Sequence, residues 1–259
     1  MSHLALRRVM IRLLHDPAFA AEVYANPADA LADVPLSADE RKWLTAQPAA
    51  AWRTDPARPA RVLAALAEEF PATVVLATEY AAGFLRSPQF HDAIQARGSL
   101  ALAFGDHLRG APDPRARAVA ALERAIAEVR RAVVRPAASD VRVHLAPTAV
   151  ITRVPRGALA LLQAIRAGAE AGALAREEDS LAREDEWVLA TGDPAGEITL
   201  EALEPALAAV LERARDGCSR DDFLTEACRQ GAEPDEAREL LVRLAADGLL
   251  AVGDADSAV

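Results

Sequence analysis

The sequence predicts a mainly α fold with a small β component, an α+β chain that ends in a compact second domain. Hydrophobic residues make up 52% of the chain and aromatic residues only 4%, and the predominance of alanine favours packed helices over sheets. Apolar residues recur at helical spacing up to residue 134 and then alternate in short stretches. We therefore expect a helical domain over 1–135, short strands with a helix and a linker over 136–184, and a strand-and-helix module over 185–259.

The helices expected in the first region are separated by proline and glycine residues. Ser37 has the position of a helix N-cap, and Glu40 stands three residues later, as in a capping box. The helix that follows is expected to bury both Trp43 and Leu44. The clearest amphipathic pattern covers 115–134, where the apolar residues at steps of three and four are Val119, Leu122, Ile126, Val129 and Val133.

The pattern changes after residue 140. Apolar and polar residues alternate over 141–145 and again over 150–154, which predicts two short strands. Pro155 is expected to start a helix that carries three apolar residues at helical spacing. Residues 167–184 are charged and of low complexity, so they form either an exposed helix or a linker.

The last region shows the most distinct boundaries. Two strands are expected at 187–189 and 198–200, joined by a turn at 192–196. Three helices and a short closing strand at 250–252 follow. The residues that mark the helix starts and ends are Pro205, Gly217, Ser219, Gly231, Pro234 and Gly248. Two strands followed by three helices are typical of a winged-helix-like module.

Both cysteines of the chain fall in this last region. Cys218 precedes the N-cap Ser219, and Phe223 has the spacing of its partner in a hydrophobic staple. Cys228 is expected on the buried face of the second helix. Because no histidine lies nearby to complete a set of metal ligands, we interpret both cysteines as structural.

The sequence contains no recognised catalytic or metal-binding motif. None of the five histidines has the spacing of a metal site, and no glycine-rich phosphate loop or nucleophile elbow is present. We therefore predict no catalytic residue, no metal ligand and no cofactor in this chain. A free-standing helical enzyme that uses His91 or His107, each next to an aspartate in sequence, stays open as an alternative.

Charge is unevenly distributed along the chain. Residues 185–259 carry six arginines, no lysine and eighteen acidic residues, a formal charge of −12, whereas the whole chain carries −10. The third helix of this module is acidic, which argues against binding to phosphate backbones and therefore to nucleic acid. A winged-helix transcriptional regulator, which this charge disfavours, stays open as the alternative function.

No apolar run is long enough to span a membrane, and the N-terminus lacks the features of a signal peptide, so we expect a cytoplasmic protein.

Four stretches carry a resemblance to a known group of proteins. The stretches 187-WVLATGDPAGEITLEALEPALAAVLERARDG-217 and 237-ARELLVRLAADGLL-250 resemble the PqqD-like RiPP recognition element, which binds leaders of ribosomally made precursor peptides. The stretches 69-EFPATVVLATEYAAGFLRSPQFHDAI-94 and 140-DVRVHLAPTAVITRVPRGALALLQAI-165 resemble the partner proteins, or peptide-modification chaperones, of multinuclear non-heme iron-dependent oxidases. Such oxidases act in methanobactin, bufferin-like metallophore and 3-thiaglutamate biosynthesis.

The resemblance implies an accessory subunit that is not itself an enzyme. It would form a heterodimer with a TIM-barrel iron-dependent oxidase, and the iron would belong to that oxidase. This chain would bind the leader of a precursor peptide and present the cysteine-containing core to the oxidase.

The expected peptide-binding site lies in the C-terminal module. An extended peptide can pair with an exposed strand edge, so we expect the leader to add beside 198–200 and to pack against the third helix. The residues expected at this site are Glu197, Ile198, Thr199, Leu200, Arg238, Leu241 and Arg243. The two arginines are the cations of the third helix and would pair with an acidic leader residue, although ion pairs along the helix surface explain them equally well.

Overall fold

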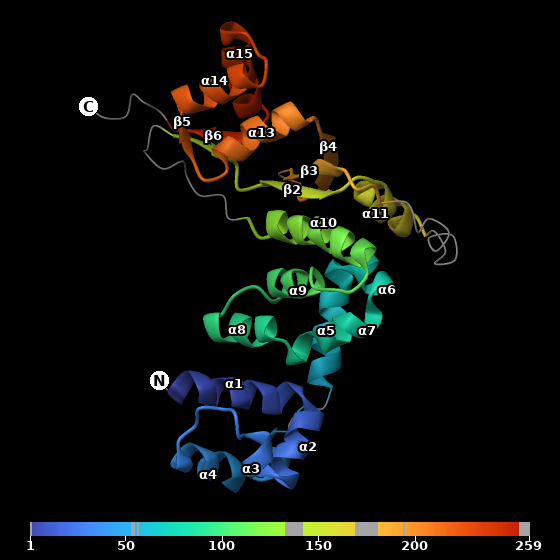
Figure 1. Ribbon diagram of the computed structural model, residues 1–259, viewed down its shortest axis with the longest axis vertical. Helices are drawn as coiled ribbons and strands as arrows, with labels where there is room; N and C mark the ends of the chain where they lie inside the picture. Colours follow the sequence, from blue (N-terminus) through green and yellow to red (C-terminus); the bar gives the residue numbers. More distant parts are fainter. Residues whose placement is uncertain are drawn as a thin grey trace, which may run out of the picture. The chain divides into compact units, whose positions relative to one another are not determined.

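A computed structural model describes residues 2–52, 55, 57–132, 142–168, 181–193 and 195–253 (Figure 1). The predicted mainly α, α+β class is confirmed, because helices dominate and the strands of this part of the chain form two small three-stranded sheets. The chain divides into two compact units, residues 1–117 and 118–259. Most of the charged stretch at 167–184 lies outside the described residues. No helix among the described residues has the length and hydropathy needed to cross a bilayer.

The first unit consists of short helices that start at prolines and at polar N-caps. The elements are α1 (Ser2–His15), α2 (Pro17–Ala25), α3 (Pro27–Ala30), α4 (Ala38–Ala46), η1 (Ala49–Trp52), α5 (Arg58–Glu69), α6 (Pro71–Leu76), α7 (Thr78–Ala82), η2 (Gly83–Arg86), α8 (Pro88–Ala96) and α9 (Leu100–Leu108). The predicted capping box is present, since Ser37 and Glu40 bond reciprocally to each other's backbone N–H. Asp16, Ser87 and Ser99 cap α2, α8 and α9 in the same unit.

Aromatic side chains fill the centre of this unit. Phe84 packs edge-to-face on Phe90 and on Phe104, with ring centroids 5.3 and 5.0 Å apart, and Phe70 packs in the same way on Phe104. All four phenylalanines are fully buried. They come from η2, α8, α9 and the residue after α5, so this cluster holds helices from across the unit together.

Helices α1–α4 and η1 form a second apolar cluster, in which the expected burial of Trp43 is wrong. Leu44 is fully buried as predicted, but Trp43 is 45% exposed. The side chain of Trp43 instead packs edge-to-face on Trp52, which is buried and donates its indole N–H to the Tyr24 hydroxyl at 2.7 Å. Only one of the two large apolar residues of α4 therefore enters the core.

The second unit is built around the antiparallel sheet β2–β3–β4. These strands are β2 (Ala149–Pro155), β3 (Asp185–Gly192) and β4 (Ile198–Leu203). Helices α10 (Pro114–Arg130) and α13 (Pro205–Ala214) lie on opposite sides of the sheet (Figure 1). Because α10 packs on this sheet, the compact unit begins at residue 118, upstream of the boundary expected at 135.

The remaining elements are the second sheet and the last two helices, which pack on the α13 side of the β2–β3–β4 sheet, and the helix that follows β2. They are β1 (Arg142–Leu145), α11 (Ala158–Arg166), β5 (Cys218–Ser219), α14 (Arg220–Arg229), α15 (Pro234–Ala246) and β6 (Leu250–Val252). Strand β1 pairs antiparallel with both β5 and β6 and forms the second sheet. Buried residues of β1, β2, β3 and the three C-terminal helices form one apolar cluster, which we call the module core.

The helix boundaries predicted for this module are found in the structure. Gly217 has a φ of 84°, Ser219 accepts a hydrogen bond from the Asp222 N–H at 3.0 Å, and Leu249 donates to the Leu244 carbonyl at 2.9 Å. Cys218 is buried in the module core with Phe223, as the staple spacing predicts. Cys228, in contrast, is exposed, so the expectation that it lies on the buried face of its helix is wrong.

Gly217 should be the most restrictive turn position in the module. A Cβ at this residue would lie 2.2 Å from Cε1 of His144 on β1, and its φ is unfavourable for other residues. We expect Gly217→Ala to lower the free energy of unfolding by more than about 2 kcal/mol, since a left-handed backbone alone costs roughly 1–2 kcal/mol. Urea unfolding measures this loss.

Gly231→Ala is the matched control, because Gly231 also has a positive φ, 105°, but has open space around a Cβ. This control should lose only the backbone strain. Equal losses in the two variants would mean that His144 does not constrain Gly217.

Candidate functional site

The edge strand β4 is positioned by a tight hairpin with β3. The Asp193 N–H donates to the Glu197 carbonyl at 2.9 Å, and the Glu197 N–H donates to the Asp193 carboxylate at 2.8 Å. Gly196, with a φ of 88°, permits the turn. The hydroxyls of Thr191 and Thr199 are 2.7 Å apart across the two strands. These contacts set the register of β4 from its first residue.

This register determines which backbone groups of β4 point away from the sheet. Hydrogen-bonded and non-hydrogen-bonded pairs alternate along an antiparallel ladder, and Asp193–Glu197 is a hydrogen-bonded pair. Ile198, Leu200 and Ala202 therefore belong to the non-hydrogen-bonded pairs, so their N–H and C=O groups point outward. The Gly192 N–H agrees with this assignment, because it donates to Thr148 on the β2 side instead of to β4.

The side chains of Ile198 and Leu200 do not face the third helix. Both pack with Val150 against a small cluster formed by Ala125, Val129 and Ala190, on the α10 side of the sheet. The module core, which contains α15, is on the other side. A leader can therefore pair with the backbone edge of β4, but the side chains of Ile198 and Leu200 pack against α10 and do not join it to the third helix.

Glu197 and Thr199 are exposed, as a contact site requires. Thr199 is paired through its hydroxyl with Thr191, and its side chain alternates with those of Ile198 and Leu200. Ala202, which the sequence reasoning missed, is also exposed and offers an outward N–H. Extending the alternation by one more step beyond Leu200 would have identified it.

The opposite edge of the sheet is partly occupied by a side chain. The guanidinium of Arg215, just after α13, donates to the Ile151 carbonyl of β2 at 2.5 Å and also pairs with Glu212. An arginine at this position occupies a backbone acceptor that another strand would need. The sheet is therefore asymmetric, since β2 is capped at Ile151 and β4 presents its outward groups at the edge.

The third helix, α15, contributes its predicted residues in different ways. Leu241 is 3% exposed and belongs to the module core, so its side chain is unavailable to a peptide in this structure. Arg238 is exposed and forms an ion pair with the exposed Asp235 one turn earlier. Arg243 is exposed, and no ion pair joins it to another described residue. Of the two arginines, Arg243 is the better placed to meet an acidic partner.

The cysteine and histidine side chains that the structure describes do not come together in a metal-binding arrangement. Among these, no three or more histidine, cysteine or acidic side chains gather in a cluster that could hold a metal ion. Burial raises the pKa of the Cys218 thiol, which opposes formation of a reactive thiolate. His107 is stacked on Tyr80, and one of its ring nitrogens lies 3.0 Å from the Tyr80 carbonyl. These environments favour a structural role for Cys218 and His107.

Comparison with known proteins leaves the family assignment as a prediction. No protein-family model matches the chain, and no curated protein matches it. The assignment of a peptide-binding edge therefore depends on the geometry of β4 and on the sequence resemblance described above.

The stability of the first unit should decrease as the pH falls below about 6.5. Burial is the largest cause that lowers the pKa of His15, His91 and His107 from their ordinary value of 6.5. The unfolded chain then binds protons that the folded chain does not, so the stabilisation is complete above pH 6.5 and is lost as the pH falls through the folded-state values.

Urea unfolding at about pH 7.5 and about pH 5.5 checks this dependence, since most carboxylates titrate below that window. A Trp187→Phe background leaves Trp43 and Trp52 as fluorescent reporters within the first unit. Replacing His107 by Gln should reduce the pH dependence. An equal or larger free energy of unfolding at the lower pH would contradict the assignment of neutral buried histidines.

Proposed function

We propose that this chain is a non-catalytic partner subunit that binds the leader of a ribosomal precursor peptide. It presents the cysteine-containing core of that peptide to a TIM-barrel iron-dependent oxidase, with which it forms a heterodimer in the cytoplasm. The iron belongs to the oxidase, and this chain supplies no cofactor. The observation that carries the proposal is the edge strand β4, where Ile198, Leu200 and Ala202 point their backbone groups outward.

An edge strand of this kind is suited to β-augmentation by an extended peptide. Backbone pairing supplies affinity with little dependence on sequence, and side chains next to the strand select among peptides. The apolar side chains of Ile198 and Leu200 anchor β4 on the α10 side, so the strand is held in place before a peptide arrives. A preorganised edge lowers the entropic cost of binding.

The order of elements after β4 supports a winged-helix-like interpretation of the module. Helix α13, strand β5, helices α14 and α15 and strand β6 follow each other, and β5 and β6 both pair with β1. A winged-helix regulator would share this order, but α15 carries Asp235, Glu236 and Glu239 against two arginines, and Asp247 follows at its C-cap. This charge disfavours contact with DNA phosphates, so the peptide-binding function is the better supported of the two.

Ala202→Pro should weaken leader binding with little effect on the fold. Proline removes the outward N–H of Ala202 but no hydrogen bond to β3, and edge strands tolerate proline. The leader acceptor left unpaired costs roughly 1–3 kcal/mol, which corresponds to about 5-fold to 150-fold in affinity. Fluorescence anisotropy with a labelled precursor leader, chosen from a short cysteine-containing open reading frame if one lies beside this gene, measures the effect.

Ala202→Val is the matched control, because it keeps the N–H and should bind the leader like the unchanged chain. Both variants should retain the thermal midpoint within a few degrees. If Ala202→Pro binds the leader as tightly as Ala202→Val, then β4 is not the docking edge.

Co-expression tests the predicted partnership. The chain should copurify in a one-to-one complex with a co-expressed TIM-barrel iron-dependent oxidase from the same genome, and iron should be recovered with the oxidase. Size-exclusion chromatography and metal analysis of the complex and of each isolated protein measure this. An isolated chain that contains stoichiometric iron and oxidises the peptide by itself would overturn the proposed role.

A further inference from the structure

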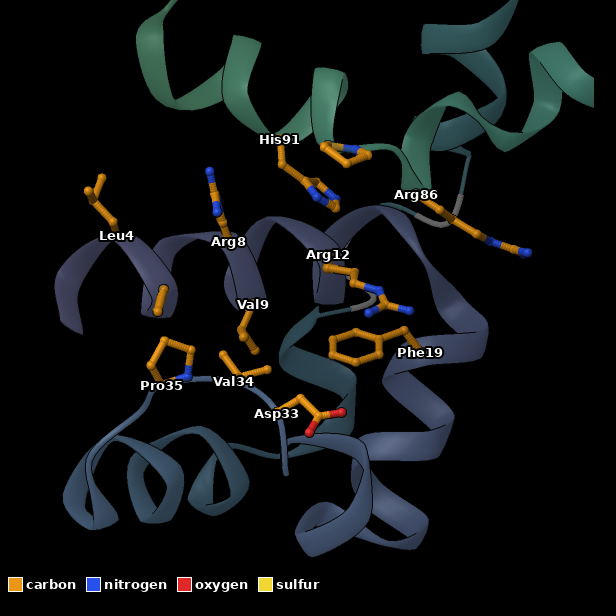
Figure 2. Close-up of a pocket in the computed structure, with 12 residues that line it drawn as sticks. Leu4, Arg8, Val9, Arg12, Phe19, Asp33, Val34, Pro35, Arg86 and His91 are labelled. Atoms are coloured by element: carbon orange, nitrogen blue, oxygen red, sulfur yellow. The ribbon is translucent and has the colours of Figure 1, made fainter. Parts of the chain in front are cut away.

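A cavity of about 450 Å³ lies within the first unit, between α1, the loop that precedes α4, and the start of α8 (Figure 2). This volume falls in the range of sites that bind small molecules. The apolar residues that line it are Leu4, Ala5, Val9, Phe19, Val34, Pro35 and Pro88. The proposed leader site uses no residue of this unit, so the cavity is distinct from that site.

The charged residues of the lining are mainly cations. Arg8 and Arg12 come from α1 and Arg86 from η2, whereas Asp33 is the one acidic residue among the described residues that line the cavity. With His91 neutral, the lining carries a net charge of +2, in a chain whose formal charge is −10. Asp92 pairs with Arg8, and Asp16 lies within 3.6 Å of both Arg12 and Arg86, so only the part of this positive charge that those carboxylates leave uncompensated favours an anionic ligand.

One of these guanidinium groups is held in position by its neighbours. Arg12 lies 3.8 Å from the ring centroid of Phe19, and its Nε is 3.6 Å from the buried carboxylate of Asp16. Arg86 shares the same carboxylate at 3.5 Å. Both distances are ion-pair contacts too long for good hydrogen bonds, so the two arginines keep donors for a further acceptor.

Two buried polar atoms at this cavity have no hydrogen-bond partner among the described residues. They are Nε of Arg12 and Nε2 of His91, whose side chain is only 9% exposed. The His91 ring also bonds to the Leu85 backbone. Figure 2 shows His91 directed from α8 toward α1. Both atoms have almost no accessible surface, so a ligand reaches them only if the Arg12 or His91 side chain turns toward the cavity. A buried polar group without a partner is unfavourable, so such a turn that pairs the group with a ligand gains binding free energy.

We propose that this cavity binds a carboxylate attached to an apolar group of up to about eight carbons. The carboxylate meets the arginines and His91, and the apolar group lies along Val9, Phe19 and Val34. A free aliphatic acid and the apolar C-terminal residue of a peptide present the same chemistry, and the ligands tested below distinguish them.

Binding should be coupled to protonation of His91. Burial is the largest cause that lowers the pKa of this ring, and the charges of Arg12 and, more weakly, Arg8 on α1 lower it further. The charge of Asp92 on α8 raises it. Arg86 and Asp33 are the other charged groups of the lining. A bound carboxylate offsets the arginines and raises the pKa of His91, so binding is accompanied by proton uptake at pH values between the pKa of the free chain and that of the complex.

Isothermal titration calorimetry of the full chain tests the ligand chemistry. Octanoate should bind saturably, whereas octan-1-ol, without the charge, and acetate, without the chain, should each bind at least about tenfold more weakly. N-acetyl-alanyl-leucine, compared with its amide, stands for the C-terminal residue of a peptide. Tighter binding of this acid than of octanoate identifies a peptide C-terminus as the ligand. Absence of saturable binding by both acids, or equal binding of octanoate and octan-1-ol, would overturn the proposal.

Variants locate the ligand. Arg8 pairs with Asp92 at the surface, so Arg8→Gln should leave the fold intact and weaken octanoate binding about tenfold. Arg7→Gln is the matched control, because Arg7 is the adjacent exposed arginine and does not line the cavity.

Asp33→Asn should strengthen octanoate binding. His91→Gln should abolish the proton uptake, measured from the binding enthalpy in buffers of different ionisation enthalpy. Equal effects of Arg8→Gln and Arg7→Gln would place the ligand elsewhere and overturn the assignment.

Discussion

The packing of α10 on the β2–β3–β4 sheet is the constraint on which the second unit depends. The contact is close, since a Cβ at Gly192 would lie 2.7 Å from Cγ1 of Val129. Val129 and Ala125 bury Ala190 completely on this side, and the module core covers the opposite side. With both faces covered and the Ile151 carbonyl of β2 occupied by Arg215, the edge of β4 is, within the described residues, the edge more open to a further strand.

In the proposed site, different groups supply the affinity for a peptide and the selectivity among peptides. The backbone of β4 supplies hydrogen bonds that any extended peptide can use, so sequence preference must come from exposed side chains nearby. Thr199 and Glu197 on the hairpin are exposed, as is Arg243 on α15, whereas Leu241 is buried. The acidic surface of the module would then discriminate against acidic peptides except where they reach a cation such as Arg243.

Local signals in the sequence predicted much of this fold, and contacts between distant segments account for the differences. The caps at Ser37, Ser219 and Gly217 depend on a few neighbouring residues, so their spacing was sufficient. The apolar residues of 198–200 indicated a strand but not which side chains face α10, because that contact joins segments more than sixty residues apart. The buried face of α4 and α14 was misassigned at Trp43 and Cys228 for a similar reason. Helical spacing does not locate the edge of a buried face.

Amide hydrogen exchange of the leader complex, resolved residue by residue, tests the central claim most directly. Leader pairing on β4 should slow exchange at the outward N–H groups of Ile198, Leu200 and Ala202. The N–H groups of Thr199 and Glu201, which already pair with β3, should change little and serve as internal controls. Slowed exchange confined to α15 or to β2, with the three outward N–H groups unchanged, would contradict the account.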